Sequence, residues 1–146
     1  MNTIANISTK ERHSGIDVGH DTLDIYLHEK QHHWIAQNCA EGIQRLVRQL
    51  RRYKLTRVVV ESSGGYERNF VEAATAAGLP IVIAQAVMVR QFAKTQGILA
   101  KTDKIDARVL ARYAEAAKPE PTQLPTEAEQ LLSALMTRRR QVIDIG

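Results

Sequence analysis

Apolar residues recur with a period of two near the start of the chain. Leu23, Ile25 and Leu27 alternate with polar or aromatic positions, which is typical of a strand with one buried face. The apolar run Ser14–Gly19 predicts a strand before it, and residues 33–37 predict one after it. Because the connections between these runs are short, we expect a three-stranded antiparallel meander.

The next segment changes to a helical period. Its apolar residues lie three or four positions apart and so share one face of a helix: Ile43, Leu46, Val47 and Leu50. The β-branched run at 57–61 then predicts a strand that is buried on both sides. Residues 66–77 predict a second helix that ends at Gly78, and residues 81–84 predict a fifth strand.

The alternation of helix and strand between residues 43 and 84 predicts parallel strands joined by crossover helices. Together with the meander this gives an α/β fold with a mixed sheet. Three antiparallel strands are followed by two parallel strands, with helices on both faces. This order of elements resembles the ribonuclease-H-like folds of the RuvC type.

The last third of the chain predicts helices separated by irregular segments. We expect a short helix at 86–94, a loop at 95–101 and a helix at 105–117. Residues 118–125 contain three prolines and predict a linker. Residues 126–146 predict a final helix whose apolar stripe needs a partner surface. Packing back on the domain is one alternative, but the pattern favours a coiled-coil or dimerisation helix, or a fragment of a longer protein.

Composition limits what such a domain can be. Hydrophobic residues make up 44% of the 146 positions and aromatic residues only 5%, so the core must rest on aliphatic side chains. We expect one domain over residues 13–117 and a disordered lead-in over residues 1–12. Cys39 is the only cysteine, which excludes an internal disulfide and a cysteine-rich metal site.

The same features bear on where the protein works. A single cysteine suits a reducing cytoplasm. No apolar run approaches the roughly 18 residues of a membrane span, and the N-terminal segment lacks the apolar core of a secretory signal. We therefore expect a cytoplasmic protein with no membrane partner.

Positive charge is concentrated in one part of the chain. The formal net charge is +4, and residues 42–60 contain six bases and no acid. Five of these bases form our predicted nucleic-acid-binding surface: Arg45, Arg48, Arg51, Arg52 and Lys54. A solvated helix face is the alternative interpretation.

Two acidic residues stand at the ends of predicted neighbouring strands. Asp17 lies inside an apolar run, where a carboxylate costs free energy unless it is paired or bound to a metal. Glu61 follows Val58–Val60 directly, in a strand that we expect to run parallel to the first. Sites collect at such strand ends in open α/β sheets. The alternatives are a turn-capping role for Asp17 and a solvated strand end for Glu61.

Asp103 and Asp106 are three positions apart and would share one face of a helix. An N-cap followed by an acid is an alternative interpretation, compatible with metal binding. Oxygen ligands without cysteine suit Mg²⁺ or Mn²⁺, and a two-metal site suits phosphodiester chemistry. Three bases around the aspartate pair are predicted to hold phosphates: Lys101, Lys104 and Arg108.

Three blocks of the sequence resemble the DEDD transposases. They are residues 15–24, residues 60–67 and residues 101–108, in this order and at these separations. The family includes the Piv-type DNA invertases and the bridge-RNA-guided recombinases of insertion sequences. The resemblance covers roughly residues 16–114.

The resemblance implies a RuvC-like N-terminal domain and a tetrad that binds divalent metal: Asp17, Glu61, Asp103 and Asp106. Asp17 would bridge two metals, and the other three acids would complete their shells. The implied activity is DNA transposition or site-specific recombination, with or without a structured guide RNA. It also implies that the linker leads into a coiled-coil helix, through which we expect a homo-oligomer.

The chain departs from this family in one respect. Family members continue into a C-terminal domain with a serine taken to be the nucleophile, and this sequence does not contain it. We therefore expect the isolated chain to be inactive in complete recombination. Simple hydrolysis, as in a junction resolvase, stays open beside transesterification because the same metals serve both.

Two other function classes remain as alternatives. The segment 16–22 also resembles the phosphate loop of actin-like ATP-binding folds, although those need two domains around the nucleotide. A non-catalytic module is the second alternative, in which the basic helix binds nucleic acid and the last helix dimerises. Insensitivity to the loss of the Asp17 carboxylate would favour that module.

Overall fold

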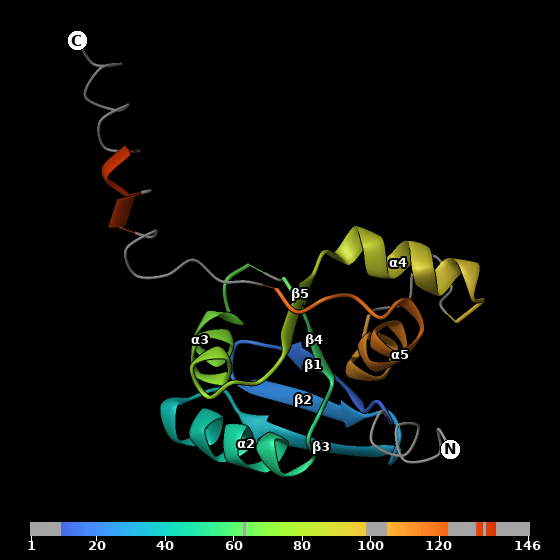
Figure 1. The fold of residues 1–146 in the computed structure, drawn as a ribbon, viewed down its shortest axis with the longest axis horizontal. Coiled ribbons are helices and arrows are strands. Elements are labelled where there is room, and N and C mark those ends of the chain that lie inside the picture. The colour runs from blue at the N-terminus through green and yellow to red at the C-terminus, as the bar shows by residue number, and fades with distance from the viewer. Residues whose placement is uncertain (1–9, 63, 99–104, 123–130, 133, 137–146) are drawn as a thin grey trace, which may run out of the picture.

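A five-stranded mixed sheet forms the centre of the domain (Figure 1). The computed structural model describes residues 10–62, 64–98, 105–122, 131–132 and 134–136. The strands are, in chain order, β1 (His13–Val18), β2 (Thr22–Leu27), β3 (His32–Gln37), β4 (Arg57–Glu61) and β5 (Ile81–Ala84). Their order in the sheet is β3-β2-β1-β4-β5. β1 to β3 form the antiparallel meander, and β4 and β5 run parallel to β1, so the predicted fold class is confirmed.

Helices cover both faces of this sheet. The described helices are α2 (Ala40–Arg52), α3 (Arg68–Ala76), α4 (Ala86–Thr95) and α5 (Ala107–Ala117). In Figure 1, α2 and α3 lie on one side of the sheet, and α4 and α5 lie on the other. All four were predicted, with boundaries that differ by up to three positions.

The alternation of side chains along β4 divides the core into two clusters. Val58 and Val60 pack with α2 and α3, whereas Val59 packs with α4 and α5. All three are fully buried, as expected for a strand that is covered on both faces. The face that carries Val59 also carries the side chain of Glu61, because alternate residues of a strand point the same way.

Gly15 permits an unusually close approach between β1 and α5. A Cβ atom at this position would lie 2.1 Å from the carbonyl oxygen of Ala107 and 2.4 Å from the backbone nitrogen of Ala111. Any side chain larger than hydrogen would therefore push the helix away from the strand. The start of α5 is thus fixed over the middle of β1.

Two helix ends follow from local sequence. Gly78 has φ +84° directly after the C-cap of α3, and its amide donates to the carbonyl oxygen of Thr75, as predicted. α5 starts two residues later than expected. Asp106 is itself the N-cap, since its Oδ1 accepts a hydrogen bond from the amide of Val109 at 2.9 Å. Asp106 is therefore not the third residue of a helix capped by Asp103.

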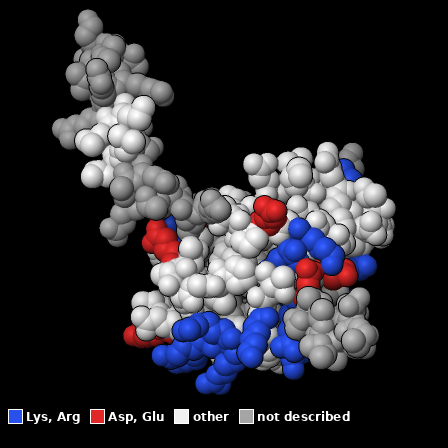
Figure 2. All heavy atoms as spheres, in the orientation of Figure 1, with Lys and Arg blue, Asp and Glu red and all other residues white. Residues whose placement is uncertain are grey.

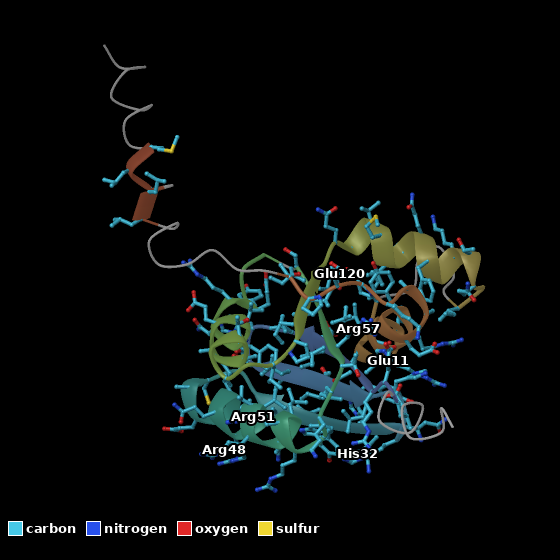
Figure 3. The ribbon with its side chains drawn as sticks, in the orientation of Figure 1. Glu11, His32, Arg48, Arg51, Arg57 and Glu120 are labelled. Atoms are coloured by element: carbon cyan, nitrogen blue, oxygen red, sulfur yellow. The ribbon has the colours of Figure 1, made fainter. Side chains whose placement is uncertain are left out.

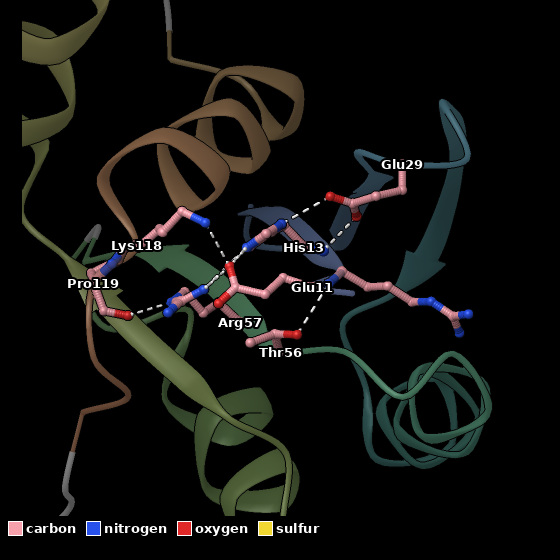
Figure 4. Close-up of polar contacts among 8 residues, drawn as sticks. Glu11, His13, Glu29, Thr56, Arg57, Lys118 and Pro119 are labelled. Atoms are coloured by element: carbon pink, nitrogen blue, oxygen red, sulfur yellow. Dashed lines mark hydrogen bonds and ion pairs between the residues drawn. The ribbon is translucent and has the colours of Figure 1, made fainter. Parts of the chain in front are cut away.

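The end of the expected lead-in belongs to the folded domain, as Figure 4 shows. The carboxylate of Glu11 accepts hydrogen bonds from Arg57 at 2.9 Å and from Lys118 at 3.0 Å. The amide of Arg12 donates to the hydroxyl of Thr56. The disordered lead-in predicted over residues 1–12 is therefore wrong for Glu11 and Arg12, because the sequence pattern did not reveal these long-range polar contacts.

The beginning of the proline-rich linker also packs on the domain. The carbonyl oxygen of Pro119 accepts a hydrogen bond from Nε of Arg57 at 2.9 Å. The amide of Thr122 donates to the carbonyl oxygen of Ile81, and its hydroxyl accepts from the amide of Ile83. Residues 118–122 are thus held against the domain as far as the outer edge of β5. Residues 123–125 lie outside the described residues.

The predicted last helix is described only in part. Residues 131, 132 and 134–136 are helical, and four large apolar side chains there are more than half exposed: Leu131, Leu132, Leu135 and Met136. The remaining residues of the 126–146 segment lie outside the described residues. Within the described ranges, no helix has the length and hydropathy needed to cross a membrane.

Candidate active site

Asp17 and Glu61 lie side by side at the carboxyl ends of β1 and β4. Ile16 pairs with Val60 in the parallel ladder, so the next residue of each strand brings the two acids together. Neighbouring strands are about 4.8 Å apart, and both side chains lie on the α4–α5 face of the sheet. Both residues are half-buried. The predicted adjacency of the two strands is confirmed.

A third acid joins this end of the sheet from β2. Asp24 pairs directly with Asp17 in the antiparallel ladder, so the two side chains lie on the same face. Asp24 was not among the predicted site residues. The signal was present, since Leu23, Ile25 and Leu27 point to the α2–α3 core and Asp24 must therefore point the other way.

Asp106 reaches the same region from the start of α5. A cavity of about 400 Å³ is lined by Asp17, Asp24, Tyr26, His33, Asp106, Ala107 and Arg108. Its walls come from three strands and one helix, which are distant in sequence. Three carboxylates thus share one cavity, and Glu61 lies beside one of them.

The charges around this cavity have opposite signs. Asp17 and Asp24 are like charges in directly opposed positions, an arrangement that destabilises a sheet. Arg108 lines the same cavity, and Nε2 of His33 lies 3.2 Å from Oδ1 of Asp24. A cation in the cavity would reduce the repulsion between the carboxylates. Among the described residues, Arg108 is the one predicted phosphate-binding base that lines this cavity.

The donor chemistry of the cavity fits a hard divalent cation. Its acidic oxygens are the ligands that Mg²⁺ and Mn²⁺ prefer. Among the described residues, no three His, Cys, Asp or Glu side chains converge closely enough to hold a metal ion. Asp103, Lys101 and Lys104 lie outside the described residues.

The loops at this end of the sheet are tied together by Asn38. Its amide Nδ2 donates to the carbonyl oxygen of Gly19 at 2.9 Å and to that of Tyr66 at 3.2 Å. The ring of Tyr66 also meets the ring of His20 edge to face, with centroids 5.4 Å apart. The turn after β1 is thereby linked to the turn after β4. His20 contacts Asp21 and Tyr66.

The predicted basic surface lies on the other side of the sheet. Arg45, Arg48, Arg51, Arg52 and Lys54 are all exposed, on α2 and just after it. Figure 2 shows Lys and Arg side chains gathered over α2, at the bottom of the view. α2 packs on the face opposite to the carboxylate cavity. These bases therefore do not line the cavity.

Comparison with known proteins gives the family. A profile of the DEDD transposases of the IS110 type matches residues 14–145. The chain is also 28% identical over 131 residues to the pilin gene-inverting proteins of Moraxella bovis and Moraxella lacunata. Each alignment covers 86% of this chain and 41% of the relative, so the chain spans less than half the length of the curated relatives it matches.

A solved structure supports the fold. Thermus thermophilus RuvC, in a complex with a Holliday junction substrate, superposes with a TM-score of 0.52 and 19% sequence identity. The match covers 77% of this chain and all of the RuvC chain. The mixed sheet with two covered faces is therefore RuvC-like. Because the profile spans nearly the whole chain, the protein belongs to the DEDD transposase family of the IS110 type.

Proposed function

We propose that this chain is a metal-binding catalytic domain of a transposase, acting on DNA phosphodiesters. The observation that carries this proposal is the gathering of Asp17, Asp24 and Asp106 around one cavity, with Glu61 beside Asp17. Three strands and a helix deliver these acids to one end of the sheet. A transposase domain needs such a centre because an anionic phosphate repels nucleophiles.

Asp17 and Glu61 would hold a divalent cation, Mg²⁺ or Mn²⁺, together with Asp106 and Asp103. When bound, such cations supply Lewis-acid stabilisation of the attacking and leaving oxygens. Asp24 lies opposite Asp17 and adds negative charge to the same pocket. Arg108 stands at the wall of the cavity and would bind a phosphate oxygen of the scissile strand.

Nucleic acid beyond the cleaved bond would contact α2. Its exposed arginines present positive charge at successive helical turns, and phosphate contacts of this kind hold a duplex without reading its sequence. A structured guide RNA presents the same phosphates, so α2 does not by itself discriminate DNA from RNA. We propose DNA as the substrate because the carboxylate site belongs to a transposase.

We also propose that complete recombination requires more than this chain. The matched region covers 41% of the pilin gene-inverting proteins. Metal binding and DNA binding need only residues of the domain described above. Strand transfer would add groups from outside it.

A second copy of the chain would cover the exposed apolar residues of the C-terminal helix. Leu131 and Leu135 are four positions apart, as are Leu132 and Met136, so each pair lies on one helical face. Leu135→Glu should shift the mass measured by analytical ultracentrifugation from dimer to monomer. A monomeric wild-type chain would contradict this proposal.

Calorimetric titration with Mn²⁺ tests the metal site. Saturable binding should weaken at least about 100-fold in Asp17→Ala and in Glu61→Ala, because even indirect partners of a metal ligand are worth 10- to 100-fold. Glu115→Ala is the matched control, since Glu115 is an exposed acid near the far end of α5. Equal Mn²⁺ affinity in all four proteins would refute the carboxylate site.

The salt dependence of DNA binding tests the basic surface. Each phosphate contact contributes about one unit to the slope of log K against log salt concentration. The double variant Arg48→Ala/Arg51→Ala should therefore lower the slope by about two. Arg68→Ala is the control, because Arg68 is exposed on α3 and bonded to Glu72. An unchanged slope in the double variant would exclude α2 from the interface.

A further inference from the structure

A second cavity lies on the opposite face of the sheet from the carboxylates. It has a volume of about 540 Å³ and is lined by His32, Trp34, Gln49, Arg52 and Tyr53. This volume is within the roughly 300–1,000 Å³ range of small-ligand pockets. His32 and Trp34 come from the edge strand β3, and the other three residues come from the end of α2. The metal site does not account for this cavity, and of the basic side chains of α2 only Arg52 lines it.

Three aromatic rings form a connected surface at this cavity. The rings of His32 and Trp34 are stacked, with centroids 5.1 Å apart and an interplanar angle of 27°. The ring of Trp34 then meets that of Tyr53 at 6.1 Å and 36°. His32 is exposed, whereas Trp34 and Tyr53 are half-buried, so the cluster is anchored in the core on one side. We call His32, Trp34 and Tyr53 the aromatic platform.

Positive charge surrounds the aromatic platform. Nζ of Lys30 lies 5.8 Å from the centroid of the Tyr53 ring, a cation–π contact. Tyr53 also borders a smaller cavity of about 240 Å³, whose lining includes three bases, Lys10, Arg12 and Lys30, and one acid, Glu29. Figure 3 places His32 on the same side of the molecule as Arg48 and Arg51 of α2. Phosphate-binding side chains therefore flank the rings in two directions.

The indole nitrogen of Trp34 argues against a purely structural role for this ring. Nε1 is buried and has no hydrogen-bond partner among the described residues. A buried donor without a partner destabilises a protein by about 1–3 kcal/mol, and an aliphatic residue at this position would avoid that. A tryptophan at this position is explained if the face of its ring stacks on a ligand.

We propose that the aromatic platform binds an unpaired base of single-stranded DNA by stacking. Rings beside a basic groove are the arrangement by which proteins bind single strands, because the groove holds phosphates and the rings hold bases. The position suits DNA that reaches the carboxylate site. His33 and Ile35 point to the cavity face of β3, whereas His32 and Trp34 point to the platform face.

A strand that passes around the β3 edge would therefore reach both sites. β3 and β1 are separated by only one strand, a distance of about 10 Å. This inference rests on the proposed DNA substrate and adds a place on the domain where an unpaired base of that DNA would bind. It assigns a role to residues of β3 and α2 that the carboxylate chemistry does not use.

Trp34 is the only tryptophan of the chain and reports directly on its own ring. We would titrate the 146-residue chain with oligothymidylate of about twelve nucleotides, within the usual 4–16 nucleotide footprint. The controls are an abasic strand of equal length, oligouridylate and a duplex. Binding is followed by anisotropy of a labelled strand, and stacking by quenching of Trp34 fluorescence. The quenching measurement uses the wild-type chain and so does not depend on whether any variant folds.

We expect oligothymidylate to quench Trp34 saturably, and the abasic strand to bind without quenching. Tyr53→Leu should weaken oligothymidylate binding roughly tenfold, which corresponds to about 1.4 kcal/mol. Tyr113→Leu is the matched control, since Tyr113 is a half-buried tyrosine of α5 that packs against Phe92. Unchanged affinity in Tyr53→Leu would overturn the proposal.

Other outcomes would separate the possible causes of failure. Equal quenching by the abasic strand would overturn stacking and leave the phosphate-binding surface of α2 intact. Quenching by oligouridylate alone would overturn DNA as the ligand. Absence of binding to every strand, measured by anisotropy, would overturn this inference and the proposed DNA contacts together, while Mn²⁺ binding would still test the carboxylate site.

Discussion

The two ends of β1 and β4 are built on opposite electrostatic principles. At the amino ends, His13 and Arg57 lie side by side in the parallel ladder, and at the carboxyl ends Asp17 and Glu61 do. The first end brings opposite charges together around the buried ring of His13. The second end gathers acids around an open cavity. The same two strands therefore carry a cohesive end and an acidic end.

The cohesive end holds several long-range hydrogen bonds. His13 is 2% exposed, and its Nδ1 and backbone amide contact the two carboxylate oxygens of Glu29 at 2.8 and 2.6 Å. Nη1 of Arg57 lies 3.2 Å from Nε2 of His13, an arrangement satisfied by a neutral imidazole with its proton on Nδ1. Burial is tolerated here because the polar atoms find partners.

At the acidic end like charges lie close to one another, whereas at the cohesive end opposite charges are paired. Asp17 faces Asp24 across the β1–β2 ladder, and Asp106 approaches from α5. Packing elsewhere in the domain must hold these carboxylates in place. Functional sites commonly store such local destabilisation. Four substitutions would test this contrast, and we order them by the size of the expected effect.

Gly15→Ala should have the largest effect, because Gly15 lies in β1 between the two ends and the substitution would force α5 away from the strand. The added methyl group would meet backbone atoms of α5 at 2.1 and 2.4 Å, which a rotamer change cannot relieve. We expect a loss of about 3 kcal/mol or more in the free energy of unfolding, at the upper end for overpacking. Urea denaturation monitored by circular dichroism would measure it.

Gly19→Ala is the matched control for this substitution. A Cβ atom there would lie 3.4 Å from the carbonyl oxygen of Thr22, an ordinary contact distance. We expect a change below about 1 kcal/mol. Similar losses for both variants would show that the close approach of β1 and α5 is not what makes Gly15 necessary.

Arg57→Met should be next in size and should act at the cohesive end. The substitution keeps most of the apolar stem but removes the donors to Glu11, His13 and Pro119. These partly buried partners of Arg57 would then each lack one hydrogen-bond donor, which should destabilise the domain by about 2–3 kcal/mol. Arg68→Met, at an exposed ion pair on α3, should change the same denaturation midpoint much less.

Acid should weaken the contacts of Glu11. Hydrogen bonds from Lys118 and Arg57 lower the pKa of Glu11 from 4.5 to about 2. Because the folded-state pKa is depressed, this contribution to stability is complete above pH 4.5 and is lost as the pH falls toward 2. The difference in Tm between the wild type and Glu11→Gln should therefore shrink over this window. A constant difference would contradict the assignment.

Asp24→Asn should have the smallest effect and the opposite sign. Removing one of two facing carboxylates should raise the stability of the metal-free domain by about 0.5 kcal/mol. The side-chain oxygen of the new asparagine can still accept from Nε2 of His33, so the contact with His33 is kept. Asp21→Asn, at an exposed acid outside the cavity, is the control in thermal unfolding. Destabilisation by Asp24→Asn would show that repulsion does not dominate this pair.

Much of this architecture was predictable from periodicity. The strands at 13–37 have a period of two and short turns, and their pairing leaves few registers that bury Leu23, Ile25 and Leu27. The parallel pairing of β1 with β4 followed from the helix between them. That pairing is what brought Asp17 and Glu61 together as predicted.

The remaining features depend on contacts that periodicity does not encode. The cohesive end joins Glu11, Arg57 and Lys118, residues from three distant parts of the chain, and no local pattern relates them. Asp24 could have been predicted by counting outward in both directions from the turn between β1 and β2. An antiparallel register fixes which residues face each other, and it places Asp24 opposite Asp17. The start of α5 was misplaced because aspartates at 103 and 106 are both residue types that can serve as an N-cap. Asp106 fills this role, since its Oδ1 accepts a hydrogen bond from the amide of Val109.

The position of Thr122 affects how this domain can associate with others. Thr122 bonds to Ile81 and Ile83 and so occupies part of the outer edge of β5. A sheet edge with unpaired backbone groups can recruit a strand from another molecule. Because the edge at β5 is partly capped, a strand from another molecule would add more readily at β3, the other edge of the sheet. Open-ended polymerisation through the sheet requires two edges with unpaired backbone groups, so the partial capping of β5 opposes it.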